Sequence, residues 1–411
     1  MINTSDLSVK LIEEVREEYG SPVYVFDEGA FKENYHNLQE TFQSYYPKYR
    51  IAYSYKTNYT PYICKKVLEY GGLAEVVSDF EYYVAKTVGY KDRDIVYNGP
   101  YKQESWKELI ENDGILNVDN IQEAKRLFEY IKSNPDKEFG VGIRINIDAG
   151  QGYISRFGIE PYSEDFKYII KEIQETGNLY LKGIHCHIGQ SRGIERWQAR
   201  VTEMLTLADA LFMDDPPEYI DLGSGMFGDM EPVFRAQFNG GVPSYEEYAR
   251  VVAKEVADHY KDETDDKKPW LYTEPGATLI SRYIWLISTV ISYKEVRGRK
   301  IAGLDCSFFN AGETVRYKRL PFHAFNQSQK YKEADFAGYT CLEDDILTTD
   351  YEGFFDIGDP VVIGNTGGYS LVFKPPFIQP DIPMVALRED DTLHLIKKGQ
   401  TFQGILSDYY I

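Results

Sequence analysis

The chain contains little cysteine, and its cysteines are not arranged for pairing. Four occur in 411 residues, and no two of them share a short, regular spacing. The four are Cys64, Cys186, Cys306 and Cys341. A small disulfide-framed scaffold needs paired spacings, so the sequence does not favour one. Unpaired thiols fit a reducing compartment, and we expect a cytoplasmic protein.

Positive charge and long apolar runs are also scarce. Lys and Arg number 45 against 65 Asp and Glu, which gives a net charge of −20. Such a chain repels phosphate backbones and anionic lipid, so we expect no nucleic-acid partner and no membrane partner. No apolar run approaches the length of a membrane span, and the charged first twenty residues contain no signal-peptide core.

The phosphate-binding motif of nucleoside triphosphatases and internal repeats are absent as well. G-K-[ST] does not occur, and no low-complexity tract stands out. Hydrophobic residues make up 43% of the chain, which is ample for a core. The length exceeds what one barrel requires, so a second domain is expected.

Eight short apolar runs alternate with stretches of helical periodicity. They are AYSYK (52–56), LAEVVS (73–78), DIVYNG (94–99), GILNVD (114–119), VGIRINI (141–147), LKGIHCHIG (181–189), YIDLGSG (219–225) and LYTEPG (271–276). Residues 119–132 typify the helices, with Asp119 as the candidate cap of an apolar stripe. This alternation predicts an α/β fold, a closed (β/α)8 barrel.

The ends of these runs carry residues of catalytic type, and catalytic groups of such barrels lie at the C-terminal strand ends. The end residues are Lys56, Ser78, Asn98, Asp119, Arg144, His187, Gly223, Gly225 and Glu274. An amine, an imidazole, a glycine turn and a carboxylate together indicate an enzyme.

The pattern changes after about residue 278. Four later stretches, beginning near 281, 300, 358 and 391, are β-rich with turn breaks. We therefore predict a barrel over 28–278 and a β-rich C-terminal domain over 279–411. The N-terminal segment 1–27 carries a strand near residue 23 that is expected to join the β domain. Residues 308–352 are expected to be irregular.

Lys56 follows the first barrel strand. Desolvation in a barrel mouth favours a neutral amine, which can form a Schiff base with an aldehyde cofactor. A surface lysine just past a strand is the alternative.

His187 and His185 are two residues apart on the sixth of these apolar runs. A zinc site would need a third ligand, and nothing at this spacing supplies one, so no metal is expected. His187 can instead stack on a planar cofactor, or be an ordinary core histidine.

LGSGMFG (222–228) is expected to form a glycine-rich turn between a strand and a helix. Its N–H groups can cradle a phosphate, although any tight turn uses glycine. Glu274 can hold a pyridine nitrogen protonated, or simply cap a helix. In combination, the lysine, histidine, glycine turn and acid are the parts of a pyridoxal-phosphate site.

The chain resembles the fold-type III pyridoxal-phosphate decarboxylases, which include the diaminopimelate, ornithine, arginine and carboxynorspermidine decarboxylases. The resemblance runs in order along nearly the whole chain. It is carried by SPVYVFDE, AYSYKTN, GGLAEVVSDFE, HCHIG, DLGSG, TEPG, GYTCLEDD and GDPVVIGNTGGYS. It implies an alanine-racemase-like barrel with a β domain, pyridoxal 5'-phosphate as cofactor, and a homodimer with shared active sites.

The resemblance also implies a role for each matching residue. Lys56 would be the Schiff-base lysine, Glu274 would pair with the ring nitrogen, and His187 would stack on the ring. Cys341 would be the proton donor supplied by the partner subunit. Further cofactor contacts would come from Glu75, Arg144, Gly223, Ser224, Gly225, Gly276 and Tyr369. Glu343 and Asp345 are the candidate substrate-binding acids.

Three departures from the family pattern bear on the substrate. Ala277 replaces the arginine of EPGR, Leu342 replaces the glutamate of C-E-S-G-D, and Gln190 stands where a serine is usual. We expect decarboxylation of a diamino acid related to diaminopimelate, ornithine or lysine. The alternatives are a carboxynorspermidine-type decarboxylase, an amino-acid racemase, a non-catalytic cofactor carrier and a metal-dependent hydrolase.

Overall fold

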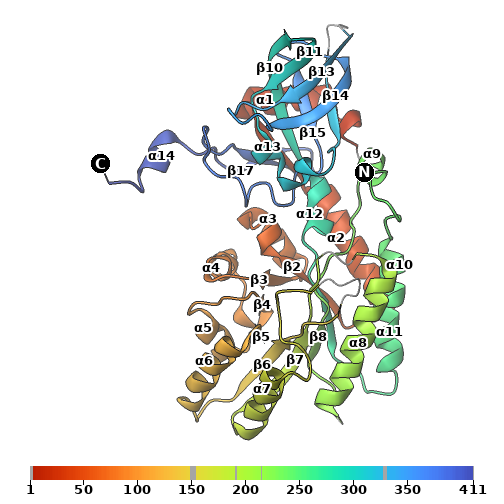
Figure 1. Cartoon of the computed structure of the whole chain (residues 1–411), viewed down its shortest axis with the longest axis vertical. Helices are drawn as coiled ribbons and strands as arrows, with labels where there is room; N and C mark the ends of the chain where they lie inside the picture. The colour runs from red at the N-terminus through yellow and green to blue at the C-terminus, as the bar shows by residue number, and fades with distance from the viewer. Residues whose placement is uncertain (1–2, 149–153, 190–191, 214, 327–330, 411) are drawn as a thin grey trace. The chain divides into compact units, whose positions relative to one another are not determined.

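The structure is a computed structural model, and it describes residues 3–148, 154–189, 192–213, 215–326 and 331–410 (Figure 1). Two compact units make up the chain. The barrel unit contains His36–Gly228 and Val242–Thr278, and the sheet unit contains Met1–Tyr35, Asp229–Gly241 and Leu279–Ile411.

Eight parallel strands close the barrel, as the sequence predicts. In order they are β2 (Tyr49–Ser54), β3 (Leu73–Val76), β4 (Ile95–Tyr97), β5 (Ile115–Val118), β6 (Phe139–Arg144), β7 (Leu179–His185), β8 (Tyr219–Asp221) and β9 (Trp270–Thr273). The ring closes where β2 pairs with β9, with Tyr49 opposite Leu271. Each strand overlaps one of the eight predicted apolar runs, and the predicted fold class is confirmed.

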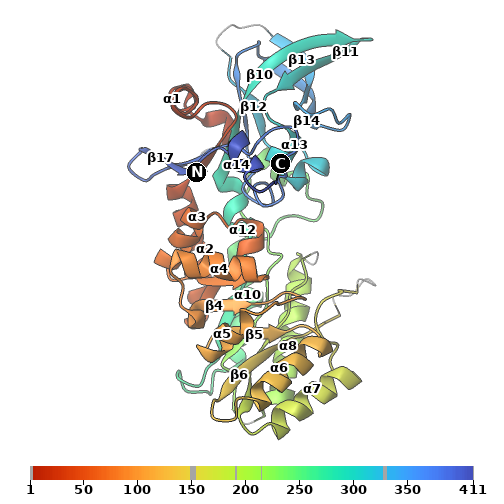
Figure 2. The same ribbon diagram turned by 90° about the vertical axis from the view of Figure 1, so that its left-hand side faces the viewer.

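Helices follow most of the strands, and Figure 2 shows α5, α6 and α7 outside them. The helices from the barrel region are α2 (Glu28–Gln43), α3 (Pro61–Glu69), α4 (Asp79–Val88), α5 (Trp106–Glu111), α6 (Ile121–Lys132), α7 (Glu164–Glu175), α8 (Ile194–Phe212), α10 (Tyr245–Val251), α11 (Ala253–His259) and α12 (Ala277–Ile280). In α6 the cap is Asn120, whose side chain accepts from Glu123 N–H. The expectation that Asp119 caps this helix is wrong, because its carboxylate binds Arg144 instead.

Two glycines make room for Tyr219 inside the barrel. A Cβ at Gly142 would collide with the Tyr219 hydroxyl and with Asn117 Oδ1. A Cβ at Gly183 would lie 2.7 Å from the Tyr219 ring. The ring therefore occupies volume that β6 and β7 leave open.

The sheet unit is built on a second, mostly antiparallel sheet. Its strands are β1 (Val23–Asp27), β10 (Ile284–Val296), β11 (Arg299–Leu304), β12 (Phe322–Ala324), β13 (Tyr331–Ala337), β14 (Ile346–Phe354), β15 (Pro360–Ile363), β16 (Met384–Leu387) and β17 (Leu393–Lys397). The order is β14-β13-β11-β10-β1-β16-β17, with β15 pairing to β10 and β12. Helices α1 (Val9–Tyr19), α9 (Pro232–Arg235), α13 (Phe308–Ala311) and α14 (Phe402–Leu406) complete it.

Two features of the sheet unit differ from the sequence expectations. Residues 308–352 are not irregular throughout, because β13 and most of β14 lie there and pair antiparallel. Residues 229–241, expected within the barrel span, belong to the sheet unit. Bonds from Thr4 to Glu231 and from Arg282 to Asp229 hold that segment.

Among the described residues, no helix is long and apolar enough to cross a membrane.

Candidate active site

Lys56 and Glu75 form an ion pair at the C-terminal ends of β2 and β3. Lys56 Nζ lies 2.6 Å from Glu75 Oε2, and Ser54 Oγ donates to the same oxygen at 2.6 Å. The Glu75 side chain is 1% exposed, whereas that of Lys56 is 30% exposed. The carboxylate is therefore fixed, and it holds an amine that remains accessible from the barrel mouth.

Glu274 is a buried, ionised carboxylate just beyond β9. Its Oε1 lies 3.1 Å from His185 Nε2. Burial raises the pKa of Glu274, but the neighbouring His185, His187 and Lys56 together outweigh burial and hold this pKa well below 4.5. Burial lowers the pKa of His185 itself. Glu274 therefore carries negative charge in a place with little water, where a cation is strongly attracted.

His187 is oriented by the glycine turn. Ser224 N–H donates to His187 Nδ1 at 3.1 Å, so Nδ1 carries no proton. Burial lowers the pKa of His187 to about 4, which keeps the ring neutral at pH 7. A neutral ring held by a backbone N–H is suited to flat contact with another ring.

Asp221 lies at the end of β8, fully buried, and its Oδ1 accepts from Gly223 N–H at 2.9 Å. Burial, followed by the nearby Glu274, raises the pKa of Asp221 well above 3.8. Burial and Glu274 therefore both favour the neutral form of Asp221.

The glycines leave a cradle that side chains would fill. Gly223 has φ +60° and Gly225 has φ +103°, and a Cβ at Gly223 would lie 2.6 Å from Cys186 O. A Cβ at Gly276 would collide with Thr57 Oγ1, next to Lys56. The turn continues through residues 229–231 without regular secondary structure, and the next helix, α9, begins at Pro232.

Arg144 lies at the end of β6 and is almost fully buried. It contacts Asp119 Oδ1 at 3.2 Å, and its guanidinium lies 4.6 Å from the centre of the Phe157 ring. Both contacts fix the guanidinium at the same end of the barrel as Lys56.

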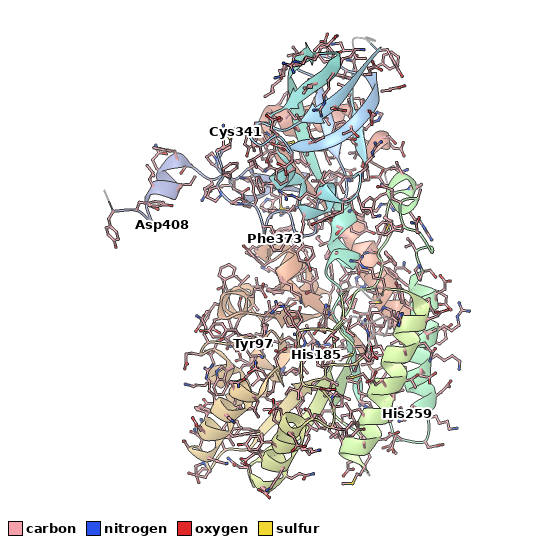
Figure 3. All side chains as sticks on the ribbon, in the orientation of Figure 1. Tyr97, His185, His259, Cys341, Phe373 and Asp408 are labelled. Atoms are coloured by element: carbon pink, nitrogen blue, oxygen red, sulfur yellow. The ribbon has the colours of Figure 1, made fainter. Side chains whose placement is uncertain are left out.

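A cluster that could bind metal is also present. His185, Asp221 and Glu274 each offer a ligand atom, and these atoms lie within 4.8 Å of one another. His185, rather than His187, is the histidine involved, and the sequence did not supply its partners. Figure 3 labels His185 in the barrel.

The predicted residues of the C-terminal region lie in the sheet unit. Cys341, also labelled in Figure 3, is the one exposed thiol among the four cysteines, all of which are described. Glu343 is exposed. Asp345 is 2% exposed, and its carboxylate accepts from Phe308 N–H at 2.8 Å and from Thr340 Oγ1 at 2.6 Å. Asp345 thus holds the Cys341 loop, and its binding of substrate stays a prediction.

Tyr369 has φ +57° and packs its ring 5.4 Å from that of Phe373. Together with Phe308, Phe309 and Tyr317 these rings line a cavity of about 290 Å³.

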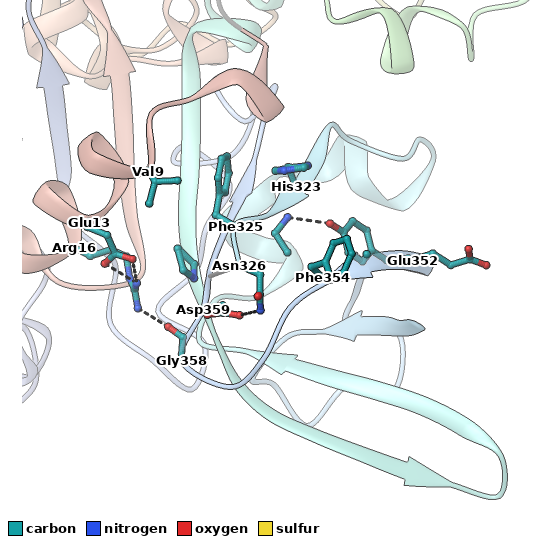
Figure 4. A pocket seen from close by; sticks show the side chains of 14 residues that line it. Val9, Glu13, Arg16, His323, Phe325, Asn326, Glu352, Phe354, Gly358 and Asp359 are labelled. Atoms are coloured by element: carbon teal, nitrogen blue, oxygen red, sulfur yellow. Dashed lines mark hydrogen bonds and ion pairs between the residues drawn. The ribbon is translucent and has the colours of Figure 1, made fainter. Parts of the chain in front are cut away.

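A larger cavity of about 940 Å³ in the same unit is lined by none of the predicted site residues (Figure 4). Its wall carries the Glu13–Arg16 pair and the Asn326–Asp359 bond, which are partnered already.

The structure thus brings together Lys56, Glu75, His187 and Glu274 at one end of the barrel. Asn98 and Asp221 contact the same group, and sequence reasoning gave neither of them a role. Their positions at strand ends were the available signal. Gln190 lies outside the described residues.

A family model described as "Pyridoxal-dependent decarboxylase, pyridoxal binding domain" matches residues 30–281. The chain belongs to the pyridoxal-dependent decarboxylases. Diaminopimelate decarboxylase of Aquifex aeolicus (strain VF5) is 26% identical over 421 aligned residues, which cover 96% of this chain and 93% of that protein. The family assignment argues for decarboxylation over the racemase, carrier and hydrolase alternatives.

Solved structures of this decarboxylase family share the fold. Diaminopimelate decarboxylase from M. jannaschii superposes with a TM-score of 0.85 at 24% identity, covering 97% of this chain and 94% of that one. The Helicobacter pylori enzyme, complexed with L-lysine, gives a TM-score of 0.81 at 21% identity, with 96% and 98% covered.

The cofactor of the family is pyridoxal phosphate, and the barrel residues fit it. An aldehyde requires an amine, which Lys56 presents. A protonated pyridine requires a buried anion, which Glu274 supplies. A phosphate requires backbone N–H groups that it can approach closely. The glycines at 223 and 276 leave such space, which a Cβ at either position would fill.

Proposed function

We propose that this pyridoxal-phosphate decarboxylase removes CO2 from a diamino acid, and that the barrel-mouth residues described above are its cofactor site. The observation that carries the proposal is the buried, ionised Glu274 on the same strand-end layer as the Lys56–Glu75 pair. An ionised acid there favours a protonated ring nitrogen, which decarboxylation needs and racemisation does not.

Each barrel residue has a proposed task toward the cofactor. Lys56 Nζ binds its aldehyde carbon, and Glu75 Oε2 orients that amine. Glu274 holds a proton on the ring nitrogen, His187 lies against the ring face, and Arg144 lies near the ring hydroxyl. The phosphate contacts are assigned to Gly223, Ser224, Gly225, Gly276 and Tyr369.

Bound pyridoxal phosphate supplies an electron sink for the bond that breaks when CO2 leaves. The chain's own groups do the remaining work. Lys56 Nζ would hold the aldehyde of the cofactor between turnovers. The buried walls around Glu75 and Glu274 keep water from their oxygens, which strengthens the field that they exert.

We further propose a homodimer with shared sites, in which the thiol of Cys341 protonates the substrate carbon of the partner's site. In support, Cys341 is exposed while the other three thiols are buried. Exposed aromatic rings accompany it in the sheet unit, with Tyr317 75% and Phe373 56% exposed. Exposed aromatic surface of this kind is typical of interfaces. Free thiols also support a cytoplasmic location.

The diamino-acid substrate rests on the names of the relatives and on charge. The Aquifex relative is named for diaminopimelate, and the Helicobacter structure contains L-lysine. In this chain, Glu343 is an exposed acid beside Cys341, suited to a cationic tail. Ala277 and Leu342, the latter 37% exposed, offer no charge for a distal carboxylate. This combination favours a substrate whose distal end is an amine.

The test is CO2 release from a panel of amino acids by the pyridoxal phosphate-loaded protein. Lysine, ornithine, arginine, diaminopimelate and carboxynorspermidine are compared, with norleucine as the uncharged control. Preference for a substrate with a distal amine over norleucine supports the proposal. Equal rates on norleucine and lysine would refute the assignment of a cationic tail.

A further inference from the structure

Four hydrogen bonds cross the barrel interior through three residues and end on the two carboxylates of the site. Tyr219 Oη donates to Asn117 Oδ1 at 2.7 Å, and Asn117 Nδ2 donates to Asn98 Oδ1 at 2.9 Å. Asn98 Nδ2 then reaches Glu75 Oε1 at 3.3 Å and also donates to Glu274 Oε1. One neutral amide therefore bridges the carboxylate that holds Lys56 and the carboxylate of the ring-nitrogen site.

The two carboxylates set the direction of this relay. An amide oxygen facing two carboxylates would be repelled, so Asn98 must turn Nδ2 toward them. Its Oδ1 then faces Asn117 and needs a donor there. That donor fixes the Asn117 amide, whose oxygen must receive the Tyr219 hydroxyl. All three relay residues are at most 2% exposed, so water cannot replace the missing partner if one is turned around.

We propose that Asn98 is a positioning residue of this decarboxylase, which holds Glu75 and Glu274 in register through its shared amide and is itself oriented by Asn117 and Tyr219. The inference rests on the proposed roles of the two carboxylates. A neutral donor suits this position because it relieves the repulsion between two anions without cancelling the charge that the cofactor needs. The gap at Gly142 gives the relay its space.

Several other charged or titratable groups surround the two carboxylates. They are Lys56, Glu81, Arg144, His185, His187 and Asp221. A third carboxylate at position 98 would oppose the existing ones and raise the pKa of every protonated group nearby.

The deciding variant is therefore Asn98→Asp, which preserves shape and exchanges the donor for an anion. Pyridoxal phosphate-loaded protein is titrated with alkali while its visible absorbance is recorded, and cofactor Kd, kcat and KM are measured alongside. Asn98→Asp is expected to raise the pH midpoint of the absorbance change by about one unit or more. It should lower kcat more than it raises KM, because the carboxylates act on the cofactor.

The matched control is Asn178→Asp, at the opposite end of the barrel. Its amide donates to Asn134 O at 3.0 Å and to Lys137 O at 2.8 Å, so the change likewise places an anion against oxygen acceptors. The control should lower Tm yet leave the absorbance midpoint at the wild-type value.

Asn117→Leu provides the second arm, because Asn117 contacts neither carboxylate and leucine adds no charge. Because this variant frees the Asn98 amide, it should weaken cofactor binding several-fold. It should also raise the pH midpoint of the absorbance change, but by less than Asn98→Asp raises it. If Asn98→Asp does not fold, Asn117→Leu decides.

Variants that bind cofactor with the wild-type pH midpoint and the wild-type Kd overturn the inference. A wild-type protein that develops no visible band with pyridoxal phosphate contradicts the proposed function instead, so the two failures are distinct.

Discussion

Asp221 and Glu274 are neighbouring buried carboxyl groups whose pKa values are displaced in opposite directions. Burial raises the pKa of Asp221, whereas His185, His187 and Lys56 together hold the pKa of Glu274 low against the effect of burial. Two adjacent carboxylates in a core rarely both ionise, because like charges repel. The opposite displacements favour the negative charge on Glu274, where the ring nitrogen is proposed to bind.

The first prediction concerns Lys56. Borohydride reduction of the loaded protein should fix the cofactor to Lys56, and peptide mapping should find the label there. Lys56→Ala should remove the visible absorbance and abolish turnover, because Glu75 holds no other amine among the residues that the structure describes. Lys102→Ala is a poor control, since that lysine is buried and paired with Glu123. The exposed Lys171 serves instead, and label on any other lysine contradicts the assignment.

The second prediction concerns Glu274. Glu274→Gln keeps the shape but removes the charge, so the ring nitrogen loses its proton. Loss of one buried electrostatic partner of this kind typically lowers kcat by about 10² to 10³. Steady-state CO2 release measures the effect, and absorbance confirms that cofactor is still bound. Near-wild-type turnover would rule out the role.

The third prediction tests the shared site. Lys56→Ala and Cys341→Ala subunits, each inactive alone, are mixed and allowed to exchange. A mixed dimer then has one doubly defective site and one intact site. Random exchange makes half of the dimers mixed, so activity should recover to about a quarter of wild type. Confirmed exchange without recovered activity would assign Cys341 to its own chain's site.

The fourth prediction concerns pH and stability. Burial raises the pKa of Glu81 from 4.5 to about 7. The protonated side chain stabilises the fold fully below pH 4.5, and this contribution is lost as pH rises toward 7. Glu81→Gln has no carboxyl group to titrate at this position. The Tm of this variant minus the Tm of wild type should therefore increase as the pH rises from 4.5 to 7. The exposed Glu175→Gln is the control, and a constant Tm difference for Glu81→Gln would contradict the expectation.

The fifth prediction concerns Gly276. A Cβ there would lie 2.8 Å from Thr57 Cβ and 3.2 Å from Ser54 Cβ, so Gly276→Ala must displace the segment that carries Lys56. Such overpacking typically costs about 1–3 kcal/mol, and cofactor Kd should rise tenfold or more. Gly177→Ala, with no atom within 4 Å of its Cβ, is the control. Equal Kd values in the two variants would refute the close fit.

The barrel strands and their catalytic ends were predictable because both are local patterns. Each strand is a short apolar run, and a residue such as Lys56 is placed simply by following one. The relay through Asn98 was not predictable, because it depends on which side chains meet across the barrel and on how two amides are turned. β13 was missed for another reason. YKEADFA contains charged residues on its exposed side, and its pairing with β14 is set by tertiary contacts.

The space left by Gly142 for Tyr219 and Asn117 has a consequence for how this barrel can vary. A side chain at 142 fits only after the residue at 219 has become smaller, so the effects of the two substitutions are not additive. The smaller residue at 219 removes the hydroxyl that orients Asn117, and the disturbance passes to Asn98. A larger residue at 142 therefore requires a smaller residue at 219 first, and that first substitution already disturbs Asn98 and the two carboxylates. The coupling between positions 142 and 219 thus favours retention of Gly142.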